Sequence, residues 1–404
     1  MTVLDNFRRQ VGRILLSLHS SLNTSKLSAH VVIRNHSSFI PKRVLIVSKV
    51  SRYQFERIRE GDISDDEFKK RVLERGTDYD KMLAGHRKNK RVEMQVIDTL
   101  NRNKIDYKLT NRLTIDKPYF DWADLVIAIG GDGTFLLGAN QIFGNEKPIF
   151  GVNSDPDASE GYLMLGKQYS RDIPRIFELL KAGNYEYVMR TRIRVTLKGE
   201  GIWGPLFHMH EKARIPGQEE FCVNKSSGER RLPWLALNEV FIGESLSART
   251  SSLEMKIDDR NDFHKVKCSG LCVSTGTGSS SWYKAINSVT SQMVSDLLRV
   301  AEPDRTFSDE QIDRICNSFN DSLQFSPDDP RMSYAIRDII LNDIWPLPKT
   351  ISPRAYCNSL TIRSQCYDAG LVFDGGVGVP FNVGTVAILE THDEDRLRTI
   401  ELTK

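Results

Sequence analysis

The chain has 404 residues, enough for two or three domains of ordinary size. Apolar residues make up 40% and charged residues 27%, the balance of a globular protein rather than of a disordered or collagen-like chain. No stretch approaches the roughly 18 unbroken apolar residues of a membrane span, and the formal net charge of +3 is low for a dedicated nucleic-acid binder. We therefore expect neither a membrane-spanning segment nor a nucleic-acid partner.

Residues 1–40 differ in composition from the rest of the chain. They hold five basic residues, seven serines and a single acid, Asp5. Apolar residues recur on one face of a helix drawn over this segment, opposite Arg9 and Arg13. These features predict a mitochondrial transit peptide and a protein of the mitochondrial matrix. An ordinary surface helix or a disordered extension is the alternative.

The first predicted domain, residues 41–187, alternates between apolar runs of strand length and helical segments. Strands are expected at 43–49, 124–129 and 148–153, a charged helical surface segment at 54–91, and a helix at 135–143 that ends at Gly144. A strand, a glycine-rich turn, a helix and a further strand form a parallel-sheet unit, and its ligands bind at the carboxyl ends of the strands. The fold class is therefore α/β for this domain.

The second predicted domain, residues 188–390, is mainly antiparallel β. Strands are expected at 193–197, 235–242, 253–257 and 271–274, with no helical crossovers between them. A polar helical insertion is predicted at 288–342, with breaks at its prolines. Residues 391–404 form a C-terminal segment that can return to the first domain.

The loop at residues 130–134 has the sequence GGDGT and follows a buried-type strand. Glycines allow backbone N–H groups to come close to a phosphate, and the following helix directs its positive end to the same place. Asp132 then lies where an attacking hydroxyl and a terminal phosphoryl group can meet. A Gly-Gly turn can also be purely structural. The chain has no GxxxxGK[ST] segment, which excludes a P-loop enzyme.

Two further segments carry polar side chains in unusual places. Asn238 and Glu239 interrupt an apolar run and suit hydrogen bonds to ribose hydroxyls or adenine, unless they mark a strand end. Residues 274–282, STGTGSSSW, offer small donors and free amides, or form only a flexible loop. Trp282 stacks on a base or packs in the core.

The cysteines and histidines lack the spacing of a metal site. The six cysteines contain no CxxC pair, which indicates free thiols rather than zinc ligands or a disulfide framework. His208 and His210 form an HxH pair, but two imidazoles without a third ligand do not complete a site. We predict no metal held by the protein's own side chains.

The GGDGT loop resembles the one shared by NAD kinases, diacylglycerol kinases, sphingosine kinases and, more distantly, phosphofructokinases. Other segments resemble NAD kinases specifically: GVN at 151–153 with GYL at 161–163, the Asn238-Glu239 pair, the serine-rich segment 274–282, and FDG at 373–375. They follow the family's order over residues 41–390. With the transit-like N-terminus, they look most like the mitochondrial NAD kinases of animals.

This resemblance implies ATP-dependent phosphorylation of the adenosine 2′-hydroxyl of NAD, giving NADP. It implies that Asp132 is the general base, that ATP enters with Mg²⁺, and that the protein is a homodimer with small nucleotides as its ligands. The residues implied to bind the ATP phosphates are Gly130, Gly131, Gly133 and Thr134. Those implied to bind NAD are Tyr162, Asn238, Glu239, Ser280, Ser281 and Trp282.

The chain departs from the family pattern in the serine-rich segment. Gly276 stands where the family usually has proline, which predicts a looser loop, and Ser269 replaces an acid near the nicotinamide end. Two alternatives remain, a lipid kinase, which should lack the Asn238-Glu239 pair, and a non-catalytic nucleotide-binding protein, which would tolerate loss of Asp132. Asp132→Asn is expected to fold normally and to lose most turnover.

Overall fold

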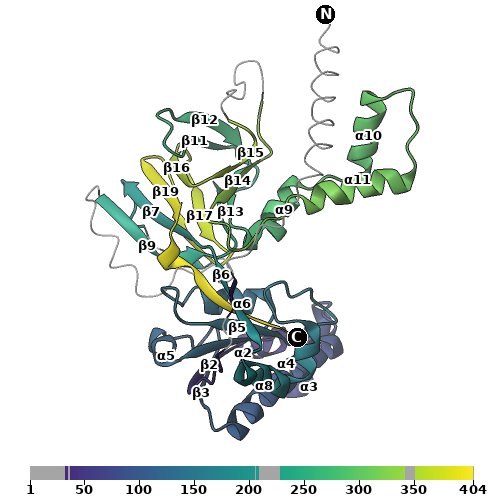
Figure 1. Cartoon of the computed structure of the whole chain (residues 1–404), viewed down its shortest axis with the longest axis vertical. Coiled ribbons are helices and arrows are strands. Elements are labelled where there is room, and N and C mark those ends of the chain that lie inside the picture. The colour runs from purple at the N-terminus through teal and green to yellow at the C-terminus, as the bar shows by residue number, and fades with distance from the viewer. Residues whose placement is uncertain (1–31, 35–36, 205, 209–227, 342–350, 404) are drawn as a thin grey trace, which may run out of the picture.

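The computed structural model describes residues 32–34, 37–204, 206–208, 228–341 and 351–403. Most of the predicted transit peptide, together with His210, lies outside these residues. The described chain forms an α/β part and a β-sandwich part, which are joined by the short connections from β6 to β7 and from β19 to β20 (Figure 1). The predicted fold class, parallel-sheet α/β followed by antiparallel β, is confirmed.

The α/β part is built on a seven-stranded sheet in the order β1-β6-β20-β5-β4-β2-β3. The four strands β2 to β5 are parallel, whereas β6 runs antiparallel to its neighbours β1 and β20. The strands are Val32–Arg34 (β1), Arg43–Ser48 (β2), Asp106–Thr110 (β3), Leu125–Gly130 (β4), Ile149–Asn153 (β5), Tyr185–Arg190 (β6) and Leu397–Leu402 (β20).

Helices cover both faces of this sheet, which explains why its central strands are apolar on both sides. In β2, Val44 and Ile46 pack with α4 and α8, while Leu45 and Val47 pack with α5 and α6. The charged segment predicted at 54–91 is helical, as expected. The helices are Arg52–Glu60 (α2), Asp65–Glu74 (α3), Tyr79–Arg102 (α4), Lys117–Trp122 (α5), Asp132–Ala139 (α6), Lys167–Arg171 (α7) and Ile173–Ala182 (α8).

The strand order creates a crevice beside β4. Strand β2 pairs with β3 on one side and with β4 on the other. The connection through α4 therefore lies on one face of the sheet, and α6, which follows β4, lies on the opposite face. Connections that diverge in this way leave a crevice at the carboxyl ends of the two strands, where open α/β sheets bind their ligands. The GGDGT loop stands at this crevice.

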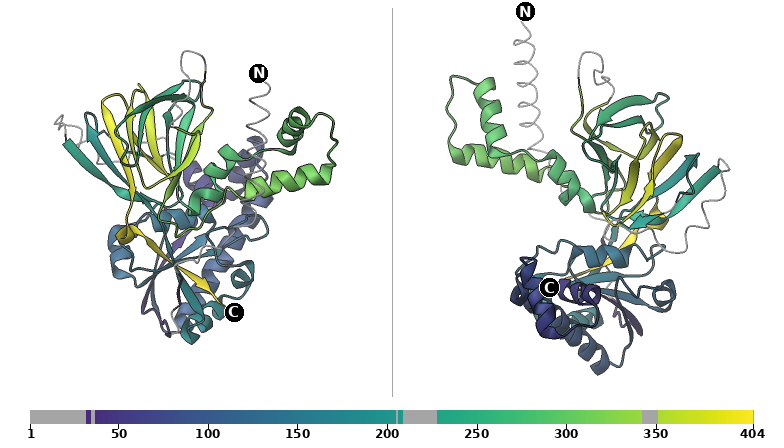
Figure 2. Two further views of the ribbon diagram at one scale, coloured as in Figure 1. Left: turned by 45° about the horizontal axis from the view of Figure 1, so that its top comes forward. Right: turned by 180° about the vertical axis from the view of Figure 1, so that it is seen from behind.

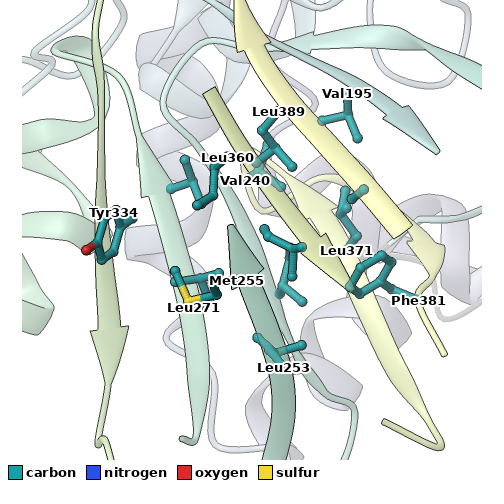
Figure 3. Packing of buried hydrophobic residues seen from close by; sticks show 14 of the residues in the cluster. Val195, Val240, Leu253, Met255, Leu271, Tyr334, Leu360, Leu371, Phe381 and Leu389 are labelled. Atoms are coloured by element: carbon teal, nitrogen blue, oxygen red, sulfur yellow. The ribbon is translucent and has the colours of Figure 1, made fainter. Parts of the chain in front are cut away.

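The β-sandwich consists of two antiparallel sheets, in the orders β12-β11-β16-β19-β7-β9 and β15-β14-β13-β10-β17-β18-β8. Its core is formed by apolar side chains from both sheets, such as Leu253 and Leu389 facing Val240 and Leu371 (Figure 3). The first sheet has β7 (Ile193–Gly199), β9 (Gly228–Ala236), β11 (Ser251–Ile257), β12 (His264–Cys268), β16 (Ser359–Ser364) and β19 (Thr385–Thr391). The second has β8 (Phe207–His208), β10 (Glu239–Glu244), β13 (Gly270–Ser274), β14 (Met332–Arg337), β15 (Arg354–Cys357), β17 (Ala369–Phe373) and β18 (Val377–Pro380).

The remaining helical elements lie between β13 and β14 and near the C-terminus. They are η2 (Thr277–Ser280), α9 (Trp282–Asn287), α10 (Ser291–Ala301), α11 (Asp309–Asp321) and η3 (Asp393–Asp395). Helices α10 and α11 form a hairpin that projects from the body of the molecule (Figure 2). The hairpin has a small apolar cluster of its own, which includes Val294, Leu298, Ile312 and Cys316.

Three predicted elements differ from the observed ones. Residues 332–337 of the predicted helical insertion form β14, because the apolar run from Met332 to Ile336 is buried beside β13. The helix predicted at 135–143 begins at Asp132 and ends at Ala139, so Gly144 is not its cap. The run predicted as one strand at 235–242 is divided between β9 and β10, which belong to different sheets.

A buried arginine fastens the end of α6 to the sandwich. Arg192 is 1% exposed and donates to the carbonyl oxygens of Ala139, Ile142 and Gly144, and to that of Asp395. These carbonyls lie at and beyond the last turn of the helix, where they lack helical partners. Burial lowers the pKa of Arg192 to about 10, so the guanidinium stays charged near neutral pH. The bonds hold the turn that follows α6 in place.

The α/β sheet includes residues from the predicted transit peptide. Strand β1 pairs antiparallel with β6, with Val32 opposite Val188. Phe39 packs against Tyr185 with ring centroids 6.1 Å apart, and its N–H donates to the carbonyl of Leu180 at 3.0 Å. Cleavage after residue 40 would therefore remove β1 and Phe39, which belong to the fold.

This arrangement predicts different effects for two truncations. Removal of residues 1–31 should leave the free energy of unfolding close to that of the full chain, whereas removal of residues 1–40 should lower it by about 2 kcal/mol through lost burial of Phe39. Urea unfolding of both forms measures the difference. Phe39→Ala in the shorter truncation should reproduce much of the loss, and equal stability of the two truncated chains would contradict the prediction.

Candidate active site

The GGDGT loop joins a fully buried strand to the helix α6. The N–H groups of Thr134 and Phe135 both donate to the carbonyl of Gly131, so the helix starts inside the loop. Apart from the adjacent residues and the helix's own backbone, no atom of the described chain lies within 4 Å of the position that a Cβ would take at Gly131 or Gly133. The loop is thus open to a ligand on this side, with the positive end of α6 directed toward it.

Asp132 is the first residue of α6, and both of its carboxylate oxygens accept backbone hydrogen bonds. The N–H of Tyr162 donates to Oδ2 at 3.1 Å, and that of Leu163 donates to Oδ1 at 3.0 Å. Gly161, at φ 68°, makes the left-handed turn that places these two N–H groups side by side. Each oxygen keeps a further lone pair, so the carboxylate can still accept a hydroxyl proton.

These bonds bear on the expectation that Asp132→Asn folds normally. An asparagine has one acceptor oxygen, so its amide nitrogen would face the N–H of either Tyr162 or Leu163. One backbone donor would then lose its acceptor, at a cost of about 1–3 kcal/mol. The variant needs its own stability measurement.

Asn238 lies in a sharp bend between β9 and β10, and Glu239 begins β10. A single buried carboxylate holds the bend: Asp374 accepts from the N–H groups of Leu237 at 2.9 Å, Asn238 at 2.7 Å and Glu239 at 3.1 Å. The Asn140 amide, oriented with its nitrogen toward Asp374, adds a bond of 3.3 Å from the end of α6. This carboxylate therefore connects the bend to the helix that starts at Asp132.

The serine-rich segment packs directly on the same bend. The N–H of Thr275 donates to the carbonyl of Asn238 at 2.9 Å, and its hydroxyl donates to the carbonyl of Leu237 at 2.5 Å. The Asn238 side chain donates to the Ser281 hydroxyl at 3.4 Å. Asn238 and Ser281, both predicted to bind NAD, are thus adjacent in space although 43 residues apart in the chain.

The other predicted residues of this segment differ in their accessibility. Trp282 is 50% exposed and lies over Phe241 with centroids 5.8 Å apart, so it is not a core residue and has a face available for stacking. The Ser280 hydroxyl donates to the carbonyl of Thr277 at 3.4 Å within its own turn. Tyr162 is 64% exposed.

The segment is packed more tightly than its sequence suggests. A Cβ on Gly276 would overlap the carbonyl oxygen of Ser326 and lie 2.9 Å from the nitrogen of Pro327. The glycine that replaces the usual proline thus allows another segment to approach closely. Thr277 and Ser279 are buried, and the Ser279 hydroxyl accepts from the N–H of Phe325 at 3.2 Å. The expected looseness is not what the packing indicates.

Two polar atoms of the bend lack a partner among the described residues. Asn238 Oδ1 and Glu239 Oε2 are buried and make no hydrogen bond there. Buried acceptors without partners are costly, so a ligand that supplies donors would be favoured here.

Burial, with a smaller contribution from Asp374, raises the pKa of Glu239 to about 8, and burial raises that of Asp374 to about 6. Glu239 is therefore mostly protonated at pH 7 and can itself donate a proton to a hydrogen bond.

Three residues contribute to the site although the sequence did not predict them as binding residues. They are Asp374, Arg190 and Arg192. Asp374 belongs to the FDG segment, but the three N–H bonds it accepts depend on a contact between strands 135 residues apart. Arg190 is the last residue of β6 and Arg192 lies two residues beyond it, and this pair of arginines before the apolar strand β7 is the available sequence signal. Each guanidinium bonds to both parts of the molecule.

The described residues contain no group of three or more His, Cys, Asp or Glu that could hold a metal ion. The five described cysteines are free and buried, in agreement with the prediction of free thiols, and Cys222 lies outside them. None of the helices in this part of the chain combines the length and apolarity needed to cross a bilayer.

The comparison with known proteins agrees with the resemblance that the sequence motifs indicate. No protein-family model matches the chain. The human protein named NAD kinase 2, mitochondrial, is 36% identical over 384 residues, which cover 91% of this chain and 86% of that protein. The Xenopus tropicalis protein of the same name is 34% identical, covering 90% of this chain and 91% of that protein.

A solved structure has the same fold. The crystal structure of yeast NADH kinase complexed with NADH superposes with a TM-score of 0.55 at 12% identity, and the match covers 91% of this chain and 89% of that chain. At this level of identity the likeness concerns the fold alone.

The buried carboxyls predict a pH dependence of stability. The pKa of Glu239 is higher in the folded protein than its usual value of 4.5, so the folded state binds the extra proton, and its contribution to stability is lost as pH rises toward 8. We expect a loss on the order of 2 kcal/mol between pH 6 and pH 8. Urea unfolding of the ligand-free protein at several pH values measures it.

Glu239→Gln should remove the slope between pH 6 and 8. Asp374→Asn is the matched comparison: it should lower stability at every pH, because it loses an acceptor for backbone N–H groups, and it should flatten the curve mainly below pH 6. An unchanged slope in Glu239→Gln would show that this carboxyl does not titrate in the range.

Proposed function

The chain belongs to the NAD kinase family and is most like its mitochondrial members in animals, and from this premise we propose that it transfers the γ-phosphoryl group of ATP to the adenosine 2′-hydroxyl of NAD. The products are NADP and ADP. The protein acts in the mitochondrion, in the matrix, and its ligands are small nucleotides.

One arrangement carries this proposal. Asp132 stands at the start of α6, at the crevice between diverging strand connections, with open glycine backbone on either side of it. The other end of the same helix is bonded through Asn140 to the carboxylate that holds the Asn238–Glu239 bend. One short helix thus joins the proposed phosphate site to a bend with two buried acceptor atoms, Asn238 Oδ1 and Glu239 Oε2, that have no hydrogen-bond partner among the described residues.

In the proposed reaction, Asp132 accepts the proton of the 2′-hydroxyl as the oxygen bonds to the γ-phosphorus. The bond from that phosphorus to the β,γ-bridging oxygen breaks, and its electron pair stays on ADP. Phosphoryl transfer depends mainly on positioning and on charge neutralisation. The backbone of Gly130, Gly131, Gly133 and Thr134 holds the phosphates of ATP, and Mg²⁺ enters with ATP and offsets their negative charge.

NAD recognition is assigned to the bend and the serine-rich segment. Asn238 Oδ1 accepts from the adenosine, and Glu239, protonated near neutral pH, donates to it or accepts through Oε2. The Ser281 and Ser280 hydroxyls add polar contacts beside Asn238, and the exposed faces of Trp282 and Tyr162 border the bound nucleotide. Their exposure and adjacency support these roles.

The proposal also includes the division of the chain into domains and its assembly. The chain divides into a leader that ends before Val32, an α/β domain at 41–187, a β-rich NAD-binding domain at 188–390 and a C-terminal segment at 391–404, and the helical insertion predicted at 288–342 ends before β14. The protein is a homodimer. Exposed Met293, Leu297 and Val300 recur at helical spacing on α10, and this apolar stripe supports self-association. Light scattering on the purified chain measures the dimer.

The proposed activity predicts that the chain lacking residues 1–31 forms NADP from NAD, ATP and Mg²⁺. Asp132→Asn should lower turnover by about 10²–10⁴-fold, the usual contribution of a general base. Asp157→Asn is the control, since Asp157 is exposed and pairs only with Arg171 in the described chain. Unfolding of both variants separates lost catalysis from lost stability.

Two results would contradict the assignment. Near-normal turnover in folded Asp132→Asn would remove the base from its role. ATP consumption only in the presence of diacylglycerol or sphingosine would favour the lipid kinase, and binding of NAD and ATP without turnover would favour a non-catalytic protein.

The location is tested separately. A fluorescent reporter fused to residues 1–31 should enter mitochondria, and replacement of Arg9 and Arg13 by glutamate should abolish import, because transit peptides depend on basic amphipathic character. A diffuse cytosolic signal from the unmodified fusion would oppose the prediction.

A further inference from the structure

A cavity of about 260 Å³ lies next to the Asp132 loop. Its lining includes Phe135 of α6 and the Tyr162–Leu163 pair whose N–H groups hold the Asp132 carboxylate. Strand β20 closes another side with Thr399 and Glu401. The cavity is therefore lined by residues that hold the Asp132 carboxylate, which the proposed reaction uses as its base.

Arg190 is the one cation among the residues that line this cavity. It is the last residue of β6, where the chain leaves the α/β sheet, and its side chain is 13% exposed. Its Nε donates to the Thr399 hydroxyl at 3.1 Å, and one Nη donates to the Thr277 hydroxyl at 3.4 Å. Thr277 belongs to the segment assigned to NAD, so the guanidinium stands between the two parts of the site.

Among the described residues, Arg190 has one direct ion pair, and it is long. Its ion pair is with Glu401 at 3.4 Å, a long contact to a side chain that is 56% exposed. Burial lowers the pKa of Arg190, while the negative charges of Glu401, Asp132 and Asp328 act in the opposite direction. Asp132 is thus close enough for electrostatic interaction. A buried cation with a weak counter-ion favours the arrival of an anion.

We propose that Arg190 is a catalytic residue that binds the phosphoryl group during its transfer and keeps this contact with the 2′-phosphate of the product. The inference rests on the proposed kinase function. The guanidinium takes no proton; its N–H groups hydrogen-bond the phosphoryl oxygens while the 2′-oxygen–phosphorus bond forms. The bond to Thr399 orients it, and the exposed Glu401 side chain can move aside.

The geometry of the guanidinium suits this role better than a single charge would. It offers five N–H donors in a planar fork that matches two oxygens of a phosphate. In the part of the chain that the structure describes, only the Nε bond is of ordinary length, and the two Nη bonds are both 3.4 Å. The Nη groups therefore lose little hydrogen-bond energy when they exchange these partners for phosphate oxygens.

The test compares Arg190→Gln and Arg190→Lys with Arg398→Gln. Arg398 is the matched control, since it lies on the same strand β20 as Thr399 but stacks over Tyr187 instead of lining the cavity. We expect Arg190→Gln to lower kcat by about 10²-fold or more with little change in the KM for NAD. Arg190→Lys should keep the fold and recover only part of the rate.

Product binding provides a readout that a structural role would not move. Calorimetric titration with NAD and with NADP gives a ratio of dissociation constants, and in Arg190→Gln this ratio should shift against NADP by about 10-fold. Guanidinium chloride at sub-denaturing concentration, compared with potassium chloride, should restore part of the turnover of Arg190→Ala.

Equal weakening of NAD and NADP binding, together with loss of stability and no rescue by guanidinium, would overturn the proposal and leave Arg190 as a structural residue. Unchanged kcat in Arg190→Gln would overturn it as well. A wild-type chain that makes no NADP would instead refute the proposed kinase, and the NADP-to-NAD binding ratio still decides whether Arg190 recognises the 2′-phosphate.

Discussion

The buried carboxylate of Asp374 is the contact on which the site depends. It accepts three successive backbone N–H groups at the point where the chain turns from one sheet of the sandwich into the other. Without it, three buried donors would lack acceptors, and the bend could not be sharp. The same carboxylate receives Asn140 at the end of α6, so the geometry of the second domain is transmitted to the helix that begins with Asp132.

Several further contacts depend on the position of this bend. The bend presents Asn238 and Glu239, the serine-rich segment packs on its carbonyls, and Ser281 comes next to Asn238. At the opposite end of α6, the backbone of Tyr162 and Leu163 fixes Asp132. Hydrogen bonds between buried groups thus join the two parts at this junction, beside an apolar contact in which Leu237 packs in one cluster with Phe135 and Ala139 of α6.

Local patterns predicted much of the fold because they depend on neighbours in the chain. The strands near residues 43–49, 124–129 and 148–153 follow from apolar runs, and the charged helices at 54–91 follow from composition. The failures occurred where distant residues decide. The run 235–242 is apolar throughout, yet it divides between two sheets because Asp374, far along the chain, holds its bend. Likewise, residues 332–337 became a strand through pairing with β13.

The sequence by itself determined the fold class, the GGDGT loop with its acid, the polar pair at 238–239 and the family of the chain. Each of these can be recognised from the types and the short spacing of residues that are close together in the chain. Only the tertiary structure decided that Asp132 is held by the backbone of residues 162–163, that Gly276 makes room for Ser326, and that Arg190 lines a cavity together with Tyr162 and Leu163. Such contacts join residues from tens to hundreds of positions apart, and short-range patterns carry no information about which distant strand ends will meet.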